Sequence, residues 1–451
     1  MESKLSVGFA RVDISPIESV PLEGYGNVHT RMSQGILDPI MGTCLAFTDE
    51  KGGTLVLITI DHCVCSGLMW PKVIEGIAEK YNLPERAVVV AATHTHSSPA
   101  CYCPQVPSAL RYTEQMIRQL IEVAGEALND RTEATLQIGR IQNEGLNFVR
   151  HYLMEDGTVA GDNFGDYKTK KILRSITEPD RNMQFIKILR KNARDILMMN
   201  WQAHPALAST ATSDYGKAHR PYVSADYVGV VRREIEDKTD MYFAFFQGAC
   251  GNINSRSYNP AETVTKNHIE YGQQVSEYVL KALKDLQDTP VGAVDSKRIT
   301  FPGKVDHTED YLLEPAKEIA ACWKAENNYR KCAEMGKPYG INSPYHAESI
   351  IRKVGMDTDL PMDISAGRVG NIGFAFIPYE PFDTNGMYIK ENSPFEMTFI
   401  LGYANGYYNY VPSKLGFDYS CYERNQCKHE PGTGEQVADS ILDMLKELHT
   451  N

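Results

Sequence analysis

Residues 88–99 of the chain read VVVAATHTHSSP. The run of β-branched and small apolar side chains predicts a buried strand over residues 87–92, and two histidines one residue apart follow shortly after it. In α/β proteins, functional side chains converge where strands end, because there the backbone stops pairing and loops begin. The stretch therefore predicts a buried strand of an α/β fold with a polar site at its end.

The rest of the chain alternates short apolar runs with amphipathic segments. The apolar runs predict further strands over residues 5–10, 42–48, 54–60, 135–140, 183–189, 195–201, 241–246, 293–301, 372–377 and 397–401. Apolar residues at three-and-four spacing predict helices over residues 68–81, 112–128, 225–237, 261–286, 311–334 and 434–448. Strands separated by helices indicate an α/β fold of mixed β-sheets covered by helices.

No boundary between domains is evident in the sequence. Residues 336–366 are rich in glycine, proline and polar groups, and we interpret them as an irregular connection within a domain rather than as a linker between domains. We therefore expect residues 1–451 to form one large domain.

The composition excludes several classes of partner. The 451 residues are 42% hydrophobic, and the formal net charge is −12 without any Lys/Arg-rich run, so nucleic acid is not an expected partner. No apolar run approaches the ~20 residues that span a bilayer, and we expect no integral membrane association. We expect a cytoplasmic protein with buried, reduced cysteines, although a secreted form trimmed of its signal would show the same sequence.

The two histidines of the opening stretch are candidates for metal chemistry. Strand side chains alternate between faces, so His94 and His96 are expected to point the same way. Two imidazoles on one face can serve as two metal ligands, or as one ligand and one general acid–base group. The spacing alone leaves both interpretations open.

Other strand ends carry polar groups as well. His204 follows the strand predicted over residues 195–201, and Pro205 takes the chain out of regular pairing there. Glu380 lies just past an apolar run, where a carboxylate has to be paired, coordinated or protonated. A glycine-rich turn at residues 247–254 offers backbone N–H groups to an anion or oxyanion.

Taken together, these stretches resemble the catalytic domain of the neutral (alkaline, non-lysosomal) ceramidase family. The strongest match is THTHSSP at residues 93–99. It is joined in the family's order by VGFARVDISP (7–16), WQAHP (201–205), SAD (224–226), QGACGNIN (247–254), IPYEP (377–381) and YYNYVPS (407–413). The resemblance implies a zinc-dependent amidase that hydrolyses the N-acyl bond of a sphingoid lipid.

The resemblance also implies roles for individual residues. One zinc ion would be bound by His94, His204, Glu380 and a tyrosine, for which Tyr410 is our choice and Tyr407 the reserve. Two further side chains would act on the substrate. His96 would transfer protons, and Arg150 would lie near the reacting carbonyl group. Such a ligand set leaves a position open for water, whose pKa zinc lowers to about 7.

The chain departs from the family at its reactive turn. Asn254 stands where the family has a serine that takes part in the reaction, and Ser255 is expected to face the other way. We therefore expect the reaction to depend on metal-bound water, with Asn254 as part of the catalytic site. The chain ends at Asn451, without room for the family's C-terminal β-sandwich, so we expect a small or amphiphilic substrate in a more open pocket.

Alternatives stay open at this stage. The same metal pocket would suit a glycosidic or lactone bond, or the chain would be a catalytically silent relative that binds a ligand. Cys101 and Cys103 offer a rival His/Cys metal site, and Asp61 is a candidate to orient a ligand histidine. A serine hydrolase is disfavoured because the chain has no G-x-S-x-G stretch. The sequence does not indicate the oligomeric state.

Overall fold

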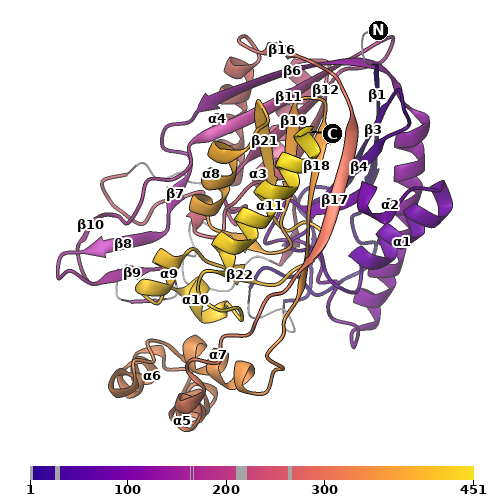
Figure 1. Ribbon diagram of the computed structural model, residues 1–451. Helices are drawn as coiled ribbons and strands as arrows, with labels where there is room; N and C mark the ends of the chain where they lie inside the picture. The colour runs from indigo at the N-terminus through magenta and orange to yellow at the C-terminus, as the bar shows by residue number, and fades with distance from the viewer. Residues whose placement is uncertain are drawn as a thin grey trace.

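The centre of the molecule is a nine-stranded mixed sheet (Figure 1). The computed structural model describes residues 4–25, 31–162, 164–165, 167–209, 221–262 and 267–450. The strands run in the order β14-β12-β11-β6-β1-β3-β4-β5, with β16 also pairing β6, and their bounds are Leu5–Asp13 (β1), Met41–Asp49 (β3), Thr54–Ile60 (β4), Val88–Ala92 (β5), Thr132–Gln142 (β6), Asn182–Arg190 (β11), Ile196–Trp201 (β12), Tyr242–Gln247 (β14) and Gln287–Thr289 (β16). The pairs β4–β5 and β12–β14 are parallel, and the other pairs are antiparallel.

The two faces of this sheet bury different layers, because strand side chains alternate. In β12, Leu197 and Met199 belong to a core with the helices α3 (Asp226–Lys238) and α4 (His268–Ala282), whereas Met198 faces the opposite way. Farther along, the helices α1 (Trp70–Tyr81) and α2 (Pro107–Asn129) cover the strands β3, β4 and β5.

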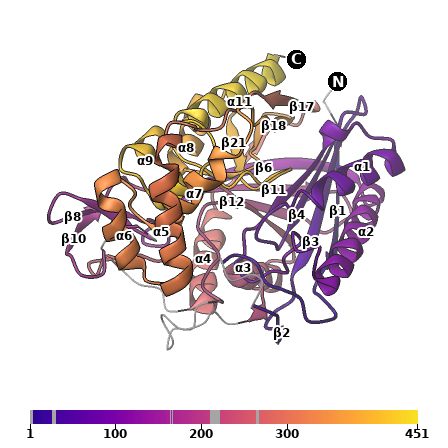
Figure 2. The ribbon, with the colours of Figure 1, turned by 90° about the horizontal axis from the view of Figure 1, so that it is seen from below.

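A second sheet packs on the opposite face. Its strands are β17 (Val294–Phe301), β18 (Met362–Val369), β19 (Ile372–Phe376) and β21 (Met397–Leu401), and they share an apolar core with the large sheet. The helices α8 (Asp383–Asn392) and α11 (Thr433–Thr450) cover its outer side. Figure 2 shows the resulting order of helices, sheet, sheet and helices.

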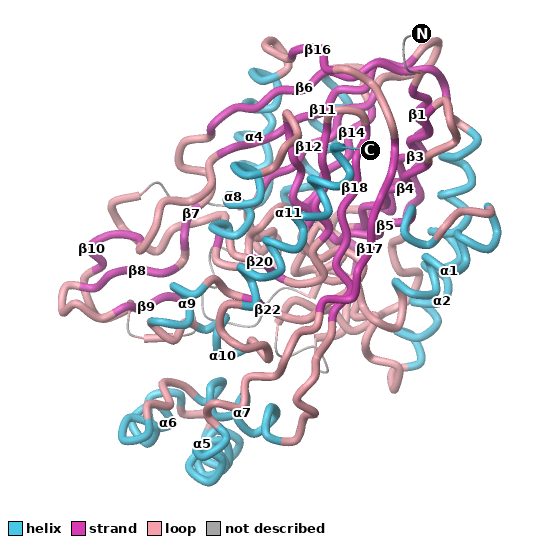
Figure 3. The backbone as a smooth tube through the Cα atoms, viewed as in Figure 1, coloured by secondary structure: helices cyan, strands magenta, loops and turns pink. Residues whose placement is uncertain are grey.

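A small helical lobe lies beyond the ends of the sheets (Figure 3). It consists of α5 (Leu313–Glu326), α6 (Tyr329–Gly336) and α7 (Pro344–Val354), and it has an apolar core of its own. The expectation of an irregular connection over residues 336–366 is therefore wrong, because α7 and the start of β18 lie in that range. Ser343 starts α7, since its hydroxyl accepts a hydrogen bond from the His346 N–H.

The predicted strands and the mixed α/β architecture are confirmed, whereas some helix boundaries are wrong. The helix predicted over 311–334 is two helices, because Asn327 adopts a left-handed conformation with φ of 47° and Asn328 caps the next helix. The ten cysteines are free, and all of them except Cys322 are buried. Among the described residues, no helix combines the length and the apolar character that crossing a membrane requires.

Short strands and helices complete the part of the chain that forms the site. They are β2 (Gly35–Ile36), β7 (Phe148–Val149), β8 (His151–Met154), β9 (Val159–Gly161), β10 (Ile172–Ser175), β13 (Tyr222–Val223), β15 (Ile253–Asn254), β20 (Glu380–Pro381), β22 (Tyr410–Val411), α9 (Lys414–Asp418) and α10 (Tyr422–Gln426). Two of these pairings matter below. β15 pairs antiparallel with β7, and β20 pairs in parallel with β22, where Glu380 lies opposite Tyr410.

Candidate metal centre

Three predicted ligands come together where strands of the two sheets end. His94 lies two residues after β5 and His204 three residues after β12, while Glu380 opens β20 shortly after β19. Their side chains are each only 2% exposed. Three segments far apart in the sequence therefore meet in one buried place, as expected from their positions at strand ends.

The donor atoms of these residues converge. The Nε2 atoms of His94 and His204 lie 3.3 and 3.5 Å from Oε2 of Glu380. One ligand atom from each of the three residues lies within 4.8 Å of the other two. An arrangement of two imidazoles and one carboxylate is a common ligand set for zinc.

The backbone fixes which imidazole nitrogens carry protons. Nδ1 of His94 lies 2.7 Å from the carbonyl oxygen of Cys63, and Nδ1 of His204 lies 2.9 Å from that of Ile253. A carbonyl oxygen only accepts, so both Nδ1 atoms donate, and neutral rings then present their Nε2 lone pairs to Glu380. Nε2 of His204 is buried and has no hydrogen-bond partner among the described residues. Two imidazole nitrogens that converge on a buried carboxylate suit a cation, so the residues fit a metal ion.

Two tyrosines complete the surroundings of the carboxylate. The Tyr407 hydroxyl donates to Oε1 of Glu380 over 2.6 Å, and the Tyr403 hydroxyl donates to Oε2 over 3.2 Å. Tyr403 also stacks on the His94 ring, with 4.0 Å between centroids. His94 has a left-handed backbone with φ of 68°, an unusual conformation for histidine that is found at functional sites.

His96 lies at the edge of the same centre. Its Nε2 lies 3.3 Å from Nε2 of His94, so the two rings meet as expected. The predicted reason, alternation along a strand, is wrong, because β5 ends at Ala92 and His94 has a left-handed backbone. Gly24 packs directly against it, since a Cβ atom at Gly24 would lie 2.6 Å from the His96 Cα. Burial, followed by the neighbouring His94 and His204 rings, lowers the pKa of His96 well below its ordinary value, which favours the neutral imidazole.

Tyr410 faces Arg150 rather than Glu380. Its hydroxyl accepts a hydrogen bond from Nη2 of Arg150 over 3.3 Å, whereas the reserve choice, Tyr407, bonds the carboxylate. Burial raises the pKa of both tyrosines well above the ordinary value, and the charge of Glu380 adds to the effect. Both hydroxyls are therefore protonated near neutral pH in the absence of a metal ion.

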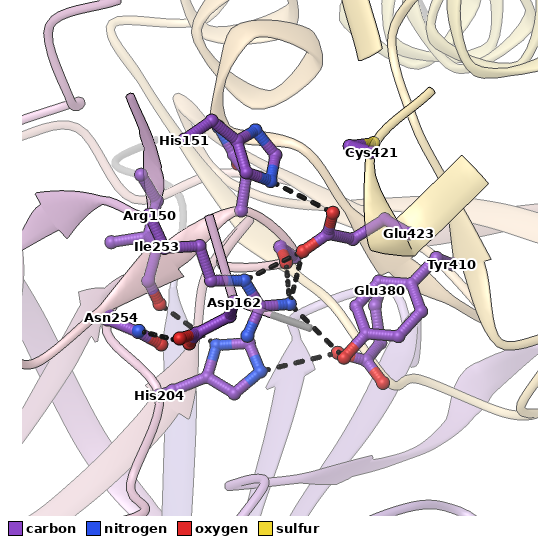
Figure 4. A network of polar contacts seen from close by, with 12 residues as sticks. Arg150, His151, Asp162, His204, Ile253, Asn254, Glu380, Tyr410, Cys421 and Glu423 are labelled. Carbon is purple, nitrogen blue, oxygen red and sulfur yellow. Dashed lines mark hydrogen bonds and ion pairs between the residues drawn. The ribbon is translucent and has the colours of Figure 1, made fainter. Parts of the chain in front are cut away.

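Arg150 is buried and tightly held (Figure 4). Its Nε and Nη2 lie 2.7 and 2.6 Å from Oε1 of Glu423, and Nη2 also donates to the Gly251 carbonyl over 2.7 Å. The other oxygen of Glu423 lies 2.9 Å from Nε2 of His151, whose Nδ1 lies 2.8 Å from the Tyr419 hydroxyl. Burial opposes the charge of Glu423, but His151 and Arg150 outweigh it and lower the pKa to about 2.

Asn254 lies on β15 beside His204, to which its backbone forms a bridge. Its side-chain amide donates to Oδ2 of Asp162 over 2.8 Å, as Figure 4 shows. Neither Asp162 nor Glu423 was among the residues that the sequence singled out. The sequence around each residue does not indicate a functional role, because the partner of each, Asn254 for Asp162 and Arg150 for Glu423, lies far away in the chain.

Two expectations about neighbouring residues are wrong. Asp61 does not orient a ligand histidine, because its oxygens pair with Nη2 of Arg232 at 2.7 and 2.8 Å. In the part of the chain that the structure describes, neither Cys101 nor Cys103 belongs to a group of three converging donor atoms. The Cys101 sulfur instead lies 4.0 Å from Nδ1 of His62.

Cys63 also lies close to the centre, since one ligand atom each of Cys63, His94 and His96 lies within 4.8 Å of the others. A hollow of about 580 Å³ between β17 and α11 contains none of the residues discussed so far. Enzyme sites are commonly found in the larger hollows, but the chemistry here points to the buried centre, because the hollow is lined mainly by solvated charged side chains.

Comparison with known proteins places the chain among its relatives. Residues 5–248 match the sequence model of the family described as neutral/alkaline non-lysosomal ceramidase, N-terminal. Neutral ceramidase 1 of Arabidopsis thaliana is 22% identical over 243 residues, and neutral ceramidase of Oryza sativa subsp. japonica is 23% identical over 239 residues. These matches span 52% and 51% of this chain but only 29% and 28% of the two relatives.

The fold has a counterpart among solved structures. The neutral ceramidase from Pseudomonas aeruginosa superimposes with a TM-score of 0.72 at 17% sequence identity, and the match covers 100% of this chain and 75% of that one. The similarity therefore extends beyond residue 248, where the family match ends, to the part of the chain that carries Glu380 and Tyr410.

Proposed function

Because the chain belongs to the neutral/alkaline non-lysosomal ceramidase family, we propose that it is a zinc-dependent hydrolase that cleaves an amide (N-acyl) bond. One observation carries this proposal. His94, His204 and Glu380 bring one ligand atom each within 4.8 Å of the others in a buried place, and Nε2 of His204 has no hydrogen-bond partner in the described part of the chain, an arrangement that a bound cation would stabilise.

The ligand residues are prepared for such an ion. Zinc bound at these atoms would supply a Lewis acid and would lower the pKa of a bound water molecule to about 7. The backbone carbonyls of Cys63 and Ile253 keep the two imidazoles in the required tautomer. Tyr410 is the proposed fourth ligand because its backbone lies opposite Glu380 in the β20–β22 pair, and metal binding would then take its hydroxyl from the contact with Arg150.

Two residues act on the substrate in this proposal. His96 lies beside the ligands, with its Nε2 3.3 Å from Nε2 of His94, so it is placed to accept the proton of the attacking water and to pass it to the leaving amine. Arg150 keeps its charge and stabilises the negative oxygen of the tetrahedral intermediate. Asn254 lines the site where its family has a serine, so the attacking group is water and not a side chain.

The proposed substrate is a small or amphiphilic N-acyl compound. The plant relatives are named ceramidases, and ceramide is an N-acyl lipid, but the match covers less than a third of their length. We therefore propose the N-acyl bond for this chain as well, and the assay described next measures which acyl and amine portions it accepts.

The test combines metal analysis with substrate profiling. The purified protein should contain one zinc ion per chain and release free amine from N-acyl compounds, with activity lost on chelation and restored by zinc. A graded series from N-acetyl amines to long-chain ceramide defines the preferred length. New reducing ends without amine would indicate a glycosidic bond instead. A protein without zinc that takes up none on addition would contradict the proposal.

A further inference from the structure

Glu423, which is outside the proposed ligand set, pairs with the buried guanidinium of Arg150 and balances its charge. Both Nε and Nη2 contact one oxygen of Glu423, at 2.7 and 2.6 Å, and the second oxygen of Glu423 contacts His151 at 2.9 Å. Glu423 is 0% exposed and His151 is 1% exposed. This buried chain of contacts continues to the Tyr419 hydroxyl, 2.8 Å from His151.

The hydrogen bonds leave one edge of the guanidinium available. Nε and Nη2 are engaged by Glu423, by the Gly251 carbonyl and by the Tyr410 hydroxyl. Within the described residues, Nη1 of Arg150 makes no hydrogen bond. A guanidinium is planar and rigid, so fixing two of its nitrogens also fixes the direction of the third.

We infer that Glu423, itself held by His151, is a positioning residue that orients Arg150 so that its Nη1 edge meets the negative oxygen formed from the substrate. This inference rests on the proposed function, because it needs an acyl substrate at the centre. It adds two residues, Glu423 and His151, that act only through Arg150.

The same residues do not form a second metal site. His151, Cys421 and Glu423 have donor atoms within 4.8 Å of one another, but each is already engaged. Both ring nitrogens of His151 have partners, and the Cys421 sulfur accepts the Arg424 N–H at the start of α10. Arg150 already supplies the positive charge that Glu423 requires, so a further cation would be repelled.

A double-mutant cycle tests the positioning role. Glu423→Gln should lower kcat by about 10²-fold, close to the loss of one oxyanion donor, with KM little changed and zinc content unchanged. In an Arg150→Ala background the same substitution should change kcat by less than about 2-fold, because a residue that acts through Arg150 has nothing left to position. Equal losses in both backgrounds would overturn the inference.

A matched control separates positioning from stability. Glu309 is also a carboxylate held between a histidine and an arginine, at 3.1 Å from His346 and 2.8 Å from Arg424, and it makes no contact with Arg150. Glu309→Gln should lower the melting temperature but leave kcat within about 2-fold of the wild type. Added guanidinium should restore turnover to Arg150→Ala only while Glu423 is present.

A spectroscopic measurement tests the contact without any substrate. The Nε–H signal of Arg150 in ¹H–¹⁵N spectra, assigned by its loss in Arg150→Lys, should move on Glu423→Gln and stay in place on Glu309→Gln. If the wild type cleaves no N-acyl compound, the proposed function fails while this signal still reports the contact. A signal that ignores Glu423→Gln would overturn the inference, whatever the activity.

Discussion

Two buried clusters in this protein use nearly the same donor atoms for different purposes. His94, His204 and Glu380 form the first, which we call the metal centre, and His151, Cys421 and Glu423 form the second, which we call the arginine clamp. In both, a carboxylate that is 0–2% exposed faces at least one imidazole. The difference is that Glu423 has a guanidinium within 2.7 Å, whereas Glu380 is bonded by tyrosine hydroxyls and faces two imidazoles.

The source of the balancing charge therefore distinguishes the two clusters. A buried carboxylate needs a positive partner. The chain supplies that partner to the clamp through Arg150. Burial, the charge of Arg150 and the ring of His94 together lower the pKa of His204 to about 4, so this imidazole is neutral near pH 7 and does not balance Glu380. In the proposed function a bound cation balances Glu380, whereas Arg150 of the chain itself balances Glu423.

The largest effect is expected for a ligand of the metal centre. His94→Ala and His204→Ala should abolish both zinc binding and turnover, because each removes one of three converging donors. Zinc content measured by elemental analysis checks this. The matched substitutions Cys421→Ser and His151→Gln, in the clamp, should retain full zinc. Loss of zinc from the clamp variants would remove the distinction between the clusters.

His96→Ala should have the next largest effect. We expect zinc to remain bound while kcat falls by about 10²- to 10⁴-fold, the usual contribution of a proton-transfer group. Zinc content and kcat measured on the same preparation check this expectation. If zinc is lost to the same extent as in His94→Ala, then His96 is itself a ligand.

Acid should destabilise the two clusters in different pH ranges when the protein is free of metal. His204 has a folded-state pKa of about 4, below its ordinary value of 6.5, so the unfolded chain binds the proton more tightly and stability falls as the pH drops from 6.5 towards 4. Glu423 has a pKa of about 2, below 4.5, so its stabilisation is present above pH 4.5 and is lost as the pH drops towards 2. Each amounts to roughly 3 kcal/mol.

Urea denaturation at pH 7, 5 and 3 measures these two losses. The variant His204→Asn should lack the first and Glu423→Gln the second. If both variants lack the same pH-dependent loss of stability, the two clusters titrate as one unit.

The smallest effect is expected at the turn where the family has a serine. Ser255→Ala should leave kcat within about 2-fold, because neither Ser255 nor Asn254 supplies the attacking group in the proposed reaction. Turnover assays with an N-acyl substrate check this expectation. Complete inactivation would instead indicate a serine nucleophile.

The sequence indicates the strands of this fold well, because each buried strand is a short apolar run such as residues 88–92. It does not indicate α8, whose sequence DTNGMYIKEN has little apolar periodicity and buries the polar residues Asp383 and Asn385. The helix predicted over residues 311–334 is divided into α5 and α6, which the prediction did not include. The cause is visible in the sequence as the pair Asn327-Asn328, because Asn327 ends α5 in a left-handed conformation and Asn328 caps α6.

The site shows the same contrast. His94, His204 and Glu380 are visible in the sequence because they stand at strand ends and within motifs that resemble a family. The clamp is not visible, because Glu423 lies in a five-residue helix and meets Arg150 across 273 positions. Only the tertiary fold brings those segments together.

Anomalous diffraction at the zinc edge tests the central claim most directly. Crystals of the protein purified with zinc should show one peak, bonded to Nε2 of His94, Nε2 of His204 and Glu380, and none beside Glu423. A peak among His151, Cys421 and Glu423, or no peak at the metal centre in zinc-loaded crystals, would contradict the account.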